Sequence, residues 1–320
     1  MKKTLLAILA LSWSFAAQAQ GFPAKPVRIV PFGTAGGPID TLARLYADKL
    51  RERWKQTVIV EPKPGASGSL AADAVARAPA DGSAFLFTLS LTHINNVILQ
   101  KSIPYDPFRD FEPLTQLAVG YGPALLAPAG APFNDVRGLL AFAKTRPEGV
   151  TYGTWGNGST PHLLTEMLAK REGVKMVHVP YKGEAAAHLD LFGGALDLAW
   201  ANSGTARNHL RTSKVKVLGA TGLQRSQVLA DTPLFGEQGF AGFDVTTWAA
   251  AFAPAKTPKA VVDELAAALR EVTRHPDIRA RWQDIGFEPV GGTPEELARI
   301  LKTDFPKWEA IIKAVGIQPE

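Results

Sequence analysis

The sequence predicts an α/β fold with two lobes, each a mainly parallel sheet flanked by helices. Three observations predict it. Short apolar runs that fit strands alternate with longer segments of helical spacing, the pattern of parallel sheets covered by helices. Glycine-rich turns join several of these strands to the next helix. Two breaks rich in Gly, Pro and Ala, near 120–130 and 240–258, divide a chain of 320 residues, which is long enough for two domains.

Residues 1–19 are predicted to be a cleaved secretory signal peptide. Lys2 and Lys3 precede an apolar segment at 5–17 that is short for a membrane span. The sequence Ala17-Gln18-Ala19 fits the small-x-small rule for signal cleavage. A retained anchor helix is the alternative. Because the chain has no cysteine, it can carry neither a cysteine-linked lipid anchor nor disulfides nor thiolate metal sites.

The first lobe begins with a strand and a long helix. Helix 38–54 is favoured by Pro38 in its first turn and by apolar residues at helical spacing. The predicted elements around it are, in order, strand 27–31, strand 57–60, helix 71–78 and strand 84–88.

Beyond the first break the alternation resumes. The predicted helices are 135–145, 161–171, 184–192 and 205–212. The predicted strands between them are 150–152, 176–180, 196–201 and 215–221. After the second break the chain is predicted to be mostly helical, at 258–274, 278–285 and 294–315, the last with a good helix start at Thr293-Pro294-Glu295-Glu296. We therefore expect residues 20–122 and 250–320 to form lobe 1 and residues 123–249 to form lobe 2.

Three glycine-rich turns, at 33–40, 64–69 and 153–162, are the candidate binding elements. Each follows a predicted strand and precedes a predicted helix, so unpaired backbone N–H groups and a positive helix end meet there. Such a place binds anions. Ligands of open α/β sheets lie at the carboxyl ends of strands, so we expect the site in the cleft between the lobes. None of the turns contains Lys or Arg, which predicts an anion held by N–H groups and hydroxyls.

Several chemistries are not supported. The turn glycines at 33, 36 and 37 do not fit a dinucleotide or phosphate loop. The serines form no GxSxG elbow, and the six histidines form no HxH or HExxH pattern. The net charge of +5 is spread without a basic block. We expect no catalytic residue, no metal, no cofactor and no nucleic-acid partner; an exported hydrolase using the glycine-turn serines is the alternative of another class.

Some residues allow two interpretations. Asp40 is either a helix-start acid or a carboxylate that orients a water or a backbone N–H in the site. Ser159 and Thr160 fit a helix N-cap, which leaves Ser159 able to face a ligand. Lys182 is an exposed turn lysine or an anion-attracting group. Trp155 lies inside a glycine turn with little core to bury it, so we expect it to line a pocket.

A series of motifs follows in order from about residue 25: PFGTAGGPIDTLAR (31–44), EPKPGASGS (61–69), PADG (79–82), IPYDPFRDFEPL (103–114), AKTRPEGVTYGTWGNGSTPHL (143–163), VPYKGEAAAHLDLFGGALDLA (179–199) and WAAAFAPAKTP (248–258). By these motifs the chain resembles the substrate-binding receptors of tripartite tricarboxylate transporters, the Bug family. The resemblance implies a two-lobe, type II periplasmic-binding-protein fold. It implies a monomeric, non-enzymatic periplasmic receptor that delivers a small organic acid to membrane transporter subunits. A sensor that presents the ligand to a membrane histidine kinase is the alternative.

The resemblance also implies which residues bind the ligand carboxylate, partly through ordered waters. It points to Phe32, Gly33, Thr34, Ala35, Gly36 and Asp40 on the first turn, to Ala66, Ser67 and Gly68 on the second, to Thr154, Trp155, Asn157, Ser159 and Thr160 on the third, and to Thr92, His93, Tyr181, Gly183 and Asn202 elsewhere. Three departures bear on the site: one extra residue in the first turn, Pro62 in place of Asn, and Trp155 in place of a small residue. Trp155 favours a flat or aromatic acid.

Overall fold

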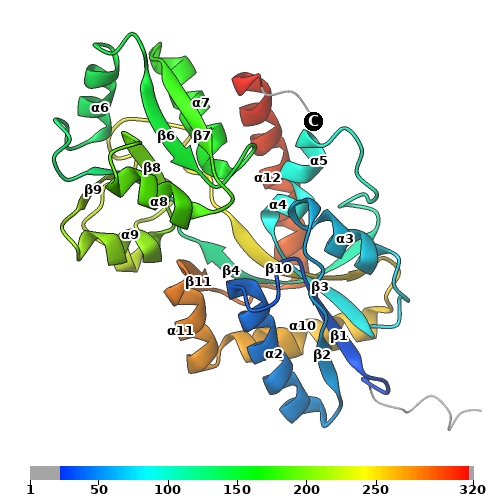
Figure 1. Cartoon of the computed structure of the whole chain (residues 1–320). Helices are drawn as coiled ribbons and strands as arrows, with labels where there is room; N and C mark the ends of the chain where they lie inside the picture. The colour runs from blue at the N-terminus through cyan, green and yellow to red at the C-terminus, as the bar shows by residue number, and fades with distance from the viewer. Residues whose placement is uncertain (1–21, 317–320) are drawn as a thin grey trace, which may run out of the picture.

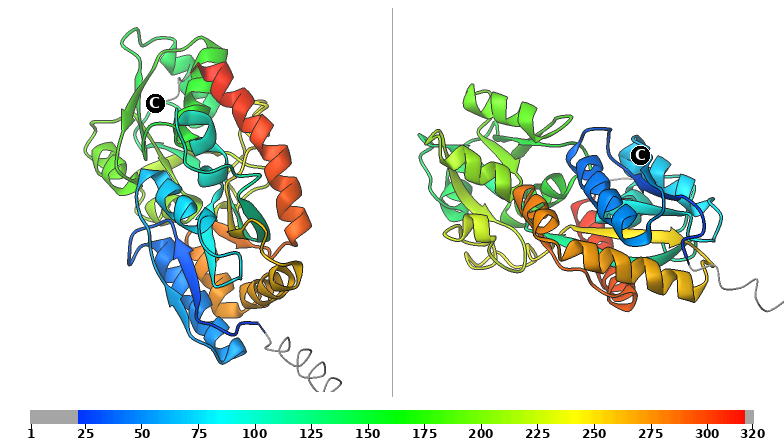
Figure 2. Two further views of the ribbon diagram at one scale, coloured as in Figure 1. Left: turned by 90° about the vertical axis from the view of Figure 1, so that its right-hand side faces the viewer. Right: turned by 90° about the horizontal axis from the view of Figure 1, so that it is seen from below.

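The computed structural model describes residues 22–316 and contains two lobes, each built on one sheet covered by helices (Figure 1). The predicted signal peptide lies outside the described residues. Seen from below, lobe 2 lies beside the larger lobe 1 (Figure 2). Among the residues that the structure describes, no helix combines the length and the apolar character needed to cross a membrane.

The sheet of lobe 1 has six strands and is assembled from both ends of the chain. In sheet order they are β11 (Phe287–Pro289), β4 (Phe111–Gly120), β10 (Trp248–Pro254), β3 (Ala84–Leu89), β1 (Val27–Pro31) and β2 (Val58–Val60). Its helices are α2 (Pro38–Trp54), α3 (Ser69–Ala76), α4 (Ser90–His93), α5 (Asn95–Leu99), α10 (Lys259–Thr273), α11 (Pro276–Asp284) and α12 (Pro294–Val315).

The sheet of lobe 2 has five strands from one continuous stretch of chain. In sheet order they are β7 (Met176–Pro180), β6 (Val150–Thr154), β8 (Leu198–Ala201), β5 (Ala124–Pro128) and β9 (Val215–Ala220). Its helices are α6 (Val136–Ala143), α7 (Thr160–Glu172), α8 (Glu184–Phe192) and α9 (Ser203–Leu210). The described chain also has two short 3₁₀ helices, η2 (Ala66–Gly68) and η3 (Gln227–Leu229).

Both sheets are mixed, which corrects the expectation of mainly parallel sheets. Strand β10 pairs antiparallel with β3 and β4, and β5 pairs antiparallel with β8 and β9. The α/β alternation predicts the parallel pairs, since a crossover helix returns the chain in the same direction. Strands β5 and β10 instead enter their sheets directly from the other lobe, without a crossover helix, and they run the opposite way.

The two predicted breaks contain these strands. The first was interpreted as a connection, but 124–128 is the strand β5, between β8 and β9. The second contains β10, which begins at Trp248, inside the range expected for lobe 2. Apolar residues flanked by Gly and Pro can be a loop or a fully buried strand, and burial decides between them. Most other predicted elements agree with the structure within three residues, whereas α4, α5, β4 and β11 were not predicted.

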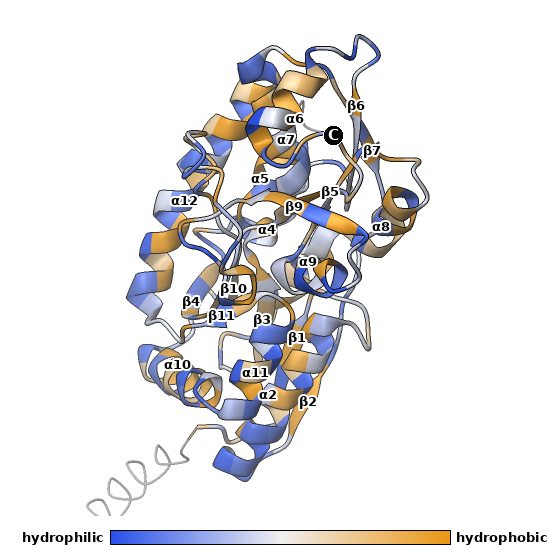
Figure 3. Ribbon diagram, turned by 90° about the vertical axis from the view of Figure 1, so that its left-hand side faces the viewer, coloured by the Kyte–Doolittle hydropathy of each residue, from blue (hydrophilic) through white to orange (hydrophobic). Residues whose placement is uncertain are grey.

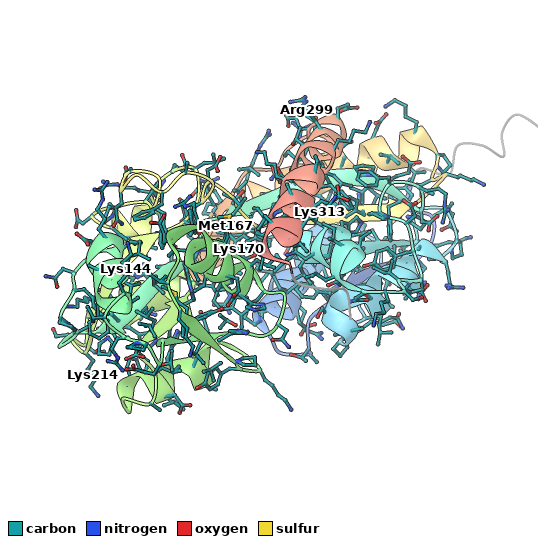
Figure 4. All side chains as sticks on the ribbon, turned by 90° about the horizontal axis from the view of Figure 1, so that it is seen from above. Lys144, Met167, Lys170, Lys214, Arg299 and Lys313 are labelled. Atoms are coloured by element: carbon teal, nitrogen blue, oxygen red, sulfur yellow. The ribbon has the colours of Figure 1, made fainter. Side chains whose placement is uncertain are left out.

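The C-terminal helix α12 connects the lobes. It starts in lobe 1 with a capping box between Thr293 and Glu296, and it ends against α7 of lobe 2. Lys170 of α7 donates from Nζ to the Ala314 carbonyl at 2.6 Å, near the labelled Lys313 (Figure 4). Hydrophilic and hydrophobic residues alternate along α12, as in a helix with one buried face (Figure 3). Helix α12, expected as part of lobe 1, therefore also contacts lobe 2.

Candidate ligand-binding cleft

A cavity of about 720 Å³ lies between the lobes, a size typical of small-molecule sites. Lobe 1 and the crossing segments line it with Phe32, Pro38, Ser67, Leu89, Ser90, Leu91, Asn95, Asn96, Leu99, Gln100, Tyr121, Pro123, Thr247 and Phe287. Lobe 2 lines it with Trp155, Asn157, Gly158, Ser159, Thr160, Gly183, Glu184 and Asn202. None of these lining residues is Lys, Arg or His, and Glu184 is the one carboxylate among them.

The N-termini of five helices meet at this cavity. Pro38 is the first residue of α2, Ser159 is the N-cap of α7, and Gly183 and Asn202 are the N-caps of α8 and α9. Ser67 directly precedes the N-cap of α3. No side chain of an N-cap residue caps any of these five helices. The cavity therefore lies in the positive field of several helix ends.

The second glycine turn is held in an unusual backbone conformation. Residues 65–68 all have positive φ, including Ala66 at 45° and Ser67 at 52°, where L-residues are rare. Asn96 stabilises the turn because its Nδ2 donates to the Ser67 carbonyl at 3.0 Å and to Ser69 Oγ at 3.1 Å. Such strain persists only where the surroundings impose it, and it is concentrated at functional sites.

Asp40 stabilises the backbone of the first glycine turn. Its side chain is only 1% exposed, and its Oδ2 accepts from the Gly36 N–H and from Arg44 Nε, both at 2.8 Å. Burial raises the pKa of Asp40, but these donors outweigh burial and hold the pKa below its ordinary value. Its other oxygen, Oδ1, is buried without a partner in the described protein. Asp40 thus orients a backbone N–H of the turn.

The third turn is supported by a pair of histidines. Thr154 is fully buried, and its Oγ1 shares a 2.7 Å hydrogen bond with Nε2 of His178. The ring of His178 stacks on His162 with centroids 3.9 Å apart. Burial and the neighbouring His162 lower the pKa of His178 to about 4, so it is neutral at pH 7. Thr154 therefore stabilises the third turn through a buried hydrogen bond.

The residues predicted for the site divide into two groups. Those that line the cavity are Phe32, Ser67, Trp155, Asn157, Ser159, Thr160, Gly183 and Asn202. Those that do not line it are Gly33, Thr34, Ala35, Gly36, Asp40, Ala66, Gly68, Thr92, His93, Thr154 and Tyr181.

Thr92 and His93 differ most clearly from the prediction that they bind the ligand, since both are fully buried. His93 stacks on Phe252 with centroids 4.0 Å apart, and burial lowers its pKa to about 3. Thr92 packs beside Gly68, where a Cβ would come within 2.5 Å of its methyl group. Tyr181 donates to Asp190 Oδ2 at 2.5 Å, away from the cavity. These residues support the turns from behind.

Several lining residues were not predicted from the sequence. Ser90, Asn95 and Asn96 lie on α4 and α5, where a loop was expected. The polar cluster after strand β3 was a usable signal, but it led to Thr92 and His93 instead. Tyr121 and Phe287 carried no signal, because they reach the cavity only through the packing of distant segments. Glu184 was read only as the start of a helix.

The family model for the tripartite tricarboxylate transporter family receptor matches residues 42–317. The chain belongs to this family. The receptor is 33% identical over 299 residues to a Pseudomonas protein from the tcbD–tcbE intergenic region, covering 93% of this chain and 88% of that protein.

Two solved structures of similar proteins contain a carboxylate. An R. palustris protein with adipate has a TM-score of 0.79 and 32% identity, covering 93% of the receptor and 100% of that chain. MatC from Rhodopseudomonas palustris with bound malate has a TM-score of 0.75 and 30% identity, covering 91% of the receptor and 100% of that chain. These comparisons support a solute-binding receptor of a tripartite transporter and give no support to the sensor or the hydrolase alternative.

Proposed function

We propose that this receptor captures a small organic carboxylate in the cleft between its lobes and delivers it to a membrane transporter. It acts in the periplasm as a monomer and catalyses no reaction. The observation that carries the proposal is the meeting of five helix N-termini at one cavity, where no Lys or Arg is among the described lining residues. Oriented N–H groups and helix dipoles bind an anion without a basic side chain.

The cavity also argues against the hydrolase alternative. Ser159 Oγ donates to the Gly156 carbonyl at 2.7 Å, and Ser90 Oγ shares a 2.9 Å hydrogen bond with Thr247. The described residues that line the cavity include no histidine, so a base for serine catalysis would have to lie outside the lining.

Isothermal titration of the purified receptor against a panel of mono-, di- and tricarboxylates tests the proposal. At least one carboxylate should bind with measurable heat, and uncharged amides of the same shape should not. A ligand at a hundredfold its dissociation constant should also add about 2.7 kcal/mol to the free energy of unfolding. A panel without a single binder, or amides that bind as well as their acids, would contradict the proposal.

We expect affinity for the bound carboxylate to depend weakly on salt. Charge enclosed between lobes is screened much less than charge at the surface. The Lys182→Ala variant should bind within about twofold of the wild type, because Lys182 is exposed and lies outside the cavity lining. Titrations at low and high NaCl check both points. A steep fall of affinity with salt, or a large loss in Lys182→Ala, would mean that a surface cation holds the ligand.

Trp155 is expected to favour flat or aromatic acids over a branched tricarboxylate such as citrate. Its half-buried indole lines the cavity, and offset stacking contributes about 0.5–1.5 kcal/mol beyond area burial. Binding of benzoate should quench tryptophan fluorescence, and Trp155→Ser should reduce the quench and weaken benzoate binding about two- to tenfold. Trp54→Phe, which changes an indole outside the cavity, should retain the quench. If citrate binds more tightly than every aromatic acid, Trp155 only bounds the cavity and does not stack on the ligand.

A further inference from the structure

Glu184 places a carboxylate in a cavity that otherwise attracts anions. It is the first residue of α8, directly after the N-cap Gly183, and it lines the cleft from the side of lobe 2. None of the ion pairs found among residues 22–316 includes Glu184. No ion pair among the described residues therefore neutralises its charge.

The hydrogen bonds of Glu184 connect it to helix α9 of the same lobe. Its Oε2 accepts from the Asn202 N–H at 2.8 Å, and its Oε1 accepts from Thr205 Oγ1 at 2.7 Å. Both donors belong to the N-terminal part of α9, of which Asn202 is the N-cap. Glu184 thus places a negative charge beside the positive end of α9.

Two histidines lie near Glu184. Beyond Glu184 lies a second cavity of about 410 Å³, which His188 and His209 also line. Nε2 of His188 lies 3.0 Å from the Trp200 carbonyl, and Nδ1 of His188 lies 3.0 Å from His209 Nε2. Burial and the neighbouring His188 lower the pKa of His209, and the charge of Glu184 partly opposes them.

The two sides of the cleft therefore differ in charge. On the side of lobe 1, the N-termini of α2 and α3 meet the cavity at Pro38 and Ser67, and the described lining of that lobe holds no acidic residue. On the side of lobe 2, the N-termini of α7 and α8 also meet the cavity, but Glu184 adds a negative charge there that repels a second carboxylate. Each of its oxygens can accept one hydrogen bond more than it does, so it attracts a donor.

We propose that the ligand carries one carboxylate, directed to lobe 1, and an ammonium or another hydrogen-bond donor at its opposite end, directed to Glu184. Amino acids with separated charges and hydroxy acids are the ligand classes that fit. Acids with a carboxylate at each end are disfavoured. This inference rests on the proposed function, because it assigns the far end of the same carboxylate ligand.

Chain-matched pairs test the inference by isothermal titration at pH 7. The pairs are succinate and 4-aminobutanoate, glutarate and 5-aminopentanoate, and adipate and 6-aminohexanoate. For the length that binds best, the wild type should bind the amino acid at least tenfold more tightly than the diacid. In Glu184→Gln, which keeps the size of the side chain and removes its charge, this ratio should fall at least tenfold.

Two control variants separate the effect of the Glu184 charge on ligand preference from the effects of removing any charge or any hydrogen bond. Glu172→Gln removes the same charge from a surface ion pair with Arg171 outside the cavity, and its ratio should equal that of the wild type. Thr205→Val removes one donor to Glu184 and keeps the charge, so it should keep the preference for the amino acid. Circular dichroism checks that each variant is folded.

The outcomes distinguish this inference from the function on which it rests. If a diacid binds the wild type as tightly as its amino acid partner, the receptor function stands and the inference is overturned. An equal ratio in Glu184→Gln and the wild type overturns it as well. If no carboxylate of any kind binds the wild type, the proposed function itself fails.

Discussion

Replacing Gly122 by alanine is expected to lower the free energy of unfolding by about 3 kcal/mol, the upper end of the usual cost of overpacking. Gly122 lies in the crossing between β4 and β5. A Cβ at this position would lie 2.1 Å from the carbonyl oxygen of Thr221, and backbone atoms cannot rotate away. Thr221 is itself fixed because its N–H donates to the Pro123 carbonyl at 3.0 Å. The substitution therefore forces apart two segments where the chain passes from one lobe to the other.

Gly130→Ala is the matched control. A Cβ at Gly130 would meet nothing within 4 Å, and its φ lies outside the positive region. We expect its unfolding midpoint in urea to lie close to that of the wild type, with a change in stability below about 0.5 kcal/mol. Equal midpoints for Gly122→Ala and Gly130→Ala would show that the crossing adapts to a methyl group and is not tightly packed.

Replacing Asp40 by alanine is expected to weaken carboxylate binding about ten- to hundredfold and also to destabilise the protein by about 1–3 kcal/mol. From the sequence, we expected a loss of affinity or of stability according to which interpretation held. The structure predicts both, because one oxygen of Asp40 receives hydrogen bonds from the Gly36 N–H in the turn and from Arg44 in the helix. Without the carboxylate, the Gly36 N–H loses its acceptor and the turn loses its anchor to α2.

Titration calorimetry and urea unfolding on the same variant separate the two effects. Asp48→Ala is the control, since Asp48 lies on the same helix in an exposed pair with Arg51. Exposed pairs contribute at most about 1 kcal/mol, and this one is far from the turn in sequence. Lower stability with unchanged affinity in Asp40→Ala would show that Asp40 only stabilises the start of its helix and does not contribute to binding.

Acidification offers an independent check on Asp40. Because its pKa is lower in the folded protein than its ordinary value, its ionisation stabilises the fold. That contribution is fully present above the ordinary pKa of about 4 and is lost as the pH falls through the lower folded value. In Asp40→Asn, the loss of stability below about pH 4 should be shallower than in the wild type. Unfolding curves at several acidic pH values measure this difference.

The sequence by itself determined the local elements and the family. Helix 38–54 and strand 176–180 were predicted with the bounds that the structure has, because periodicity and end signals lie within the segments themselves. The glycine turns were also recognisable locally, since a strand followed by glycines and a helix start needs no distant partner. Their convergence on one cleft followed from the rule that strand carboxyl ends meet at one edge of a sheet.

Only the tertiary structure decided which side chains face the cavity. Strand β10 pairs with β3 and β4, more than a hundred residues earlier in the chain, and that pairing brings Thr247 beside Ser90. No local pattern encodes such a meeting. The same holds for Glu184, which the sequence shows as an ordinary first-turn acid. Its role depends on the position of α9 beside α8, because the fold decides which hydrogen-bond donors lie within reach of a carboxylate.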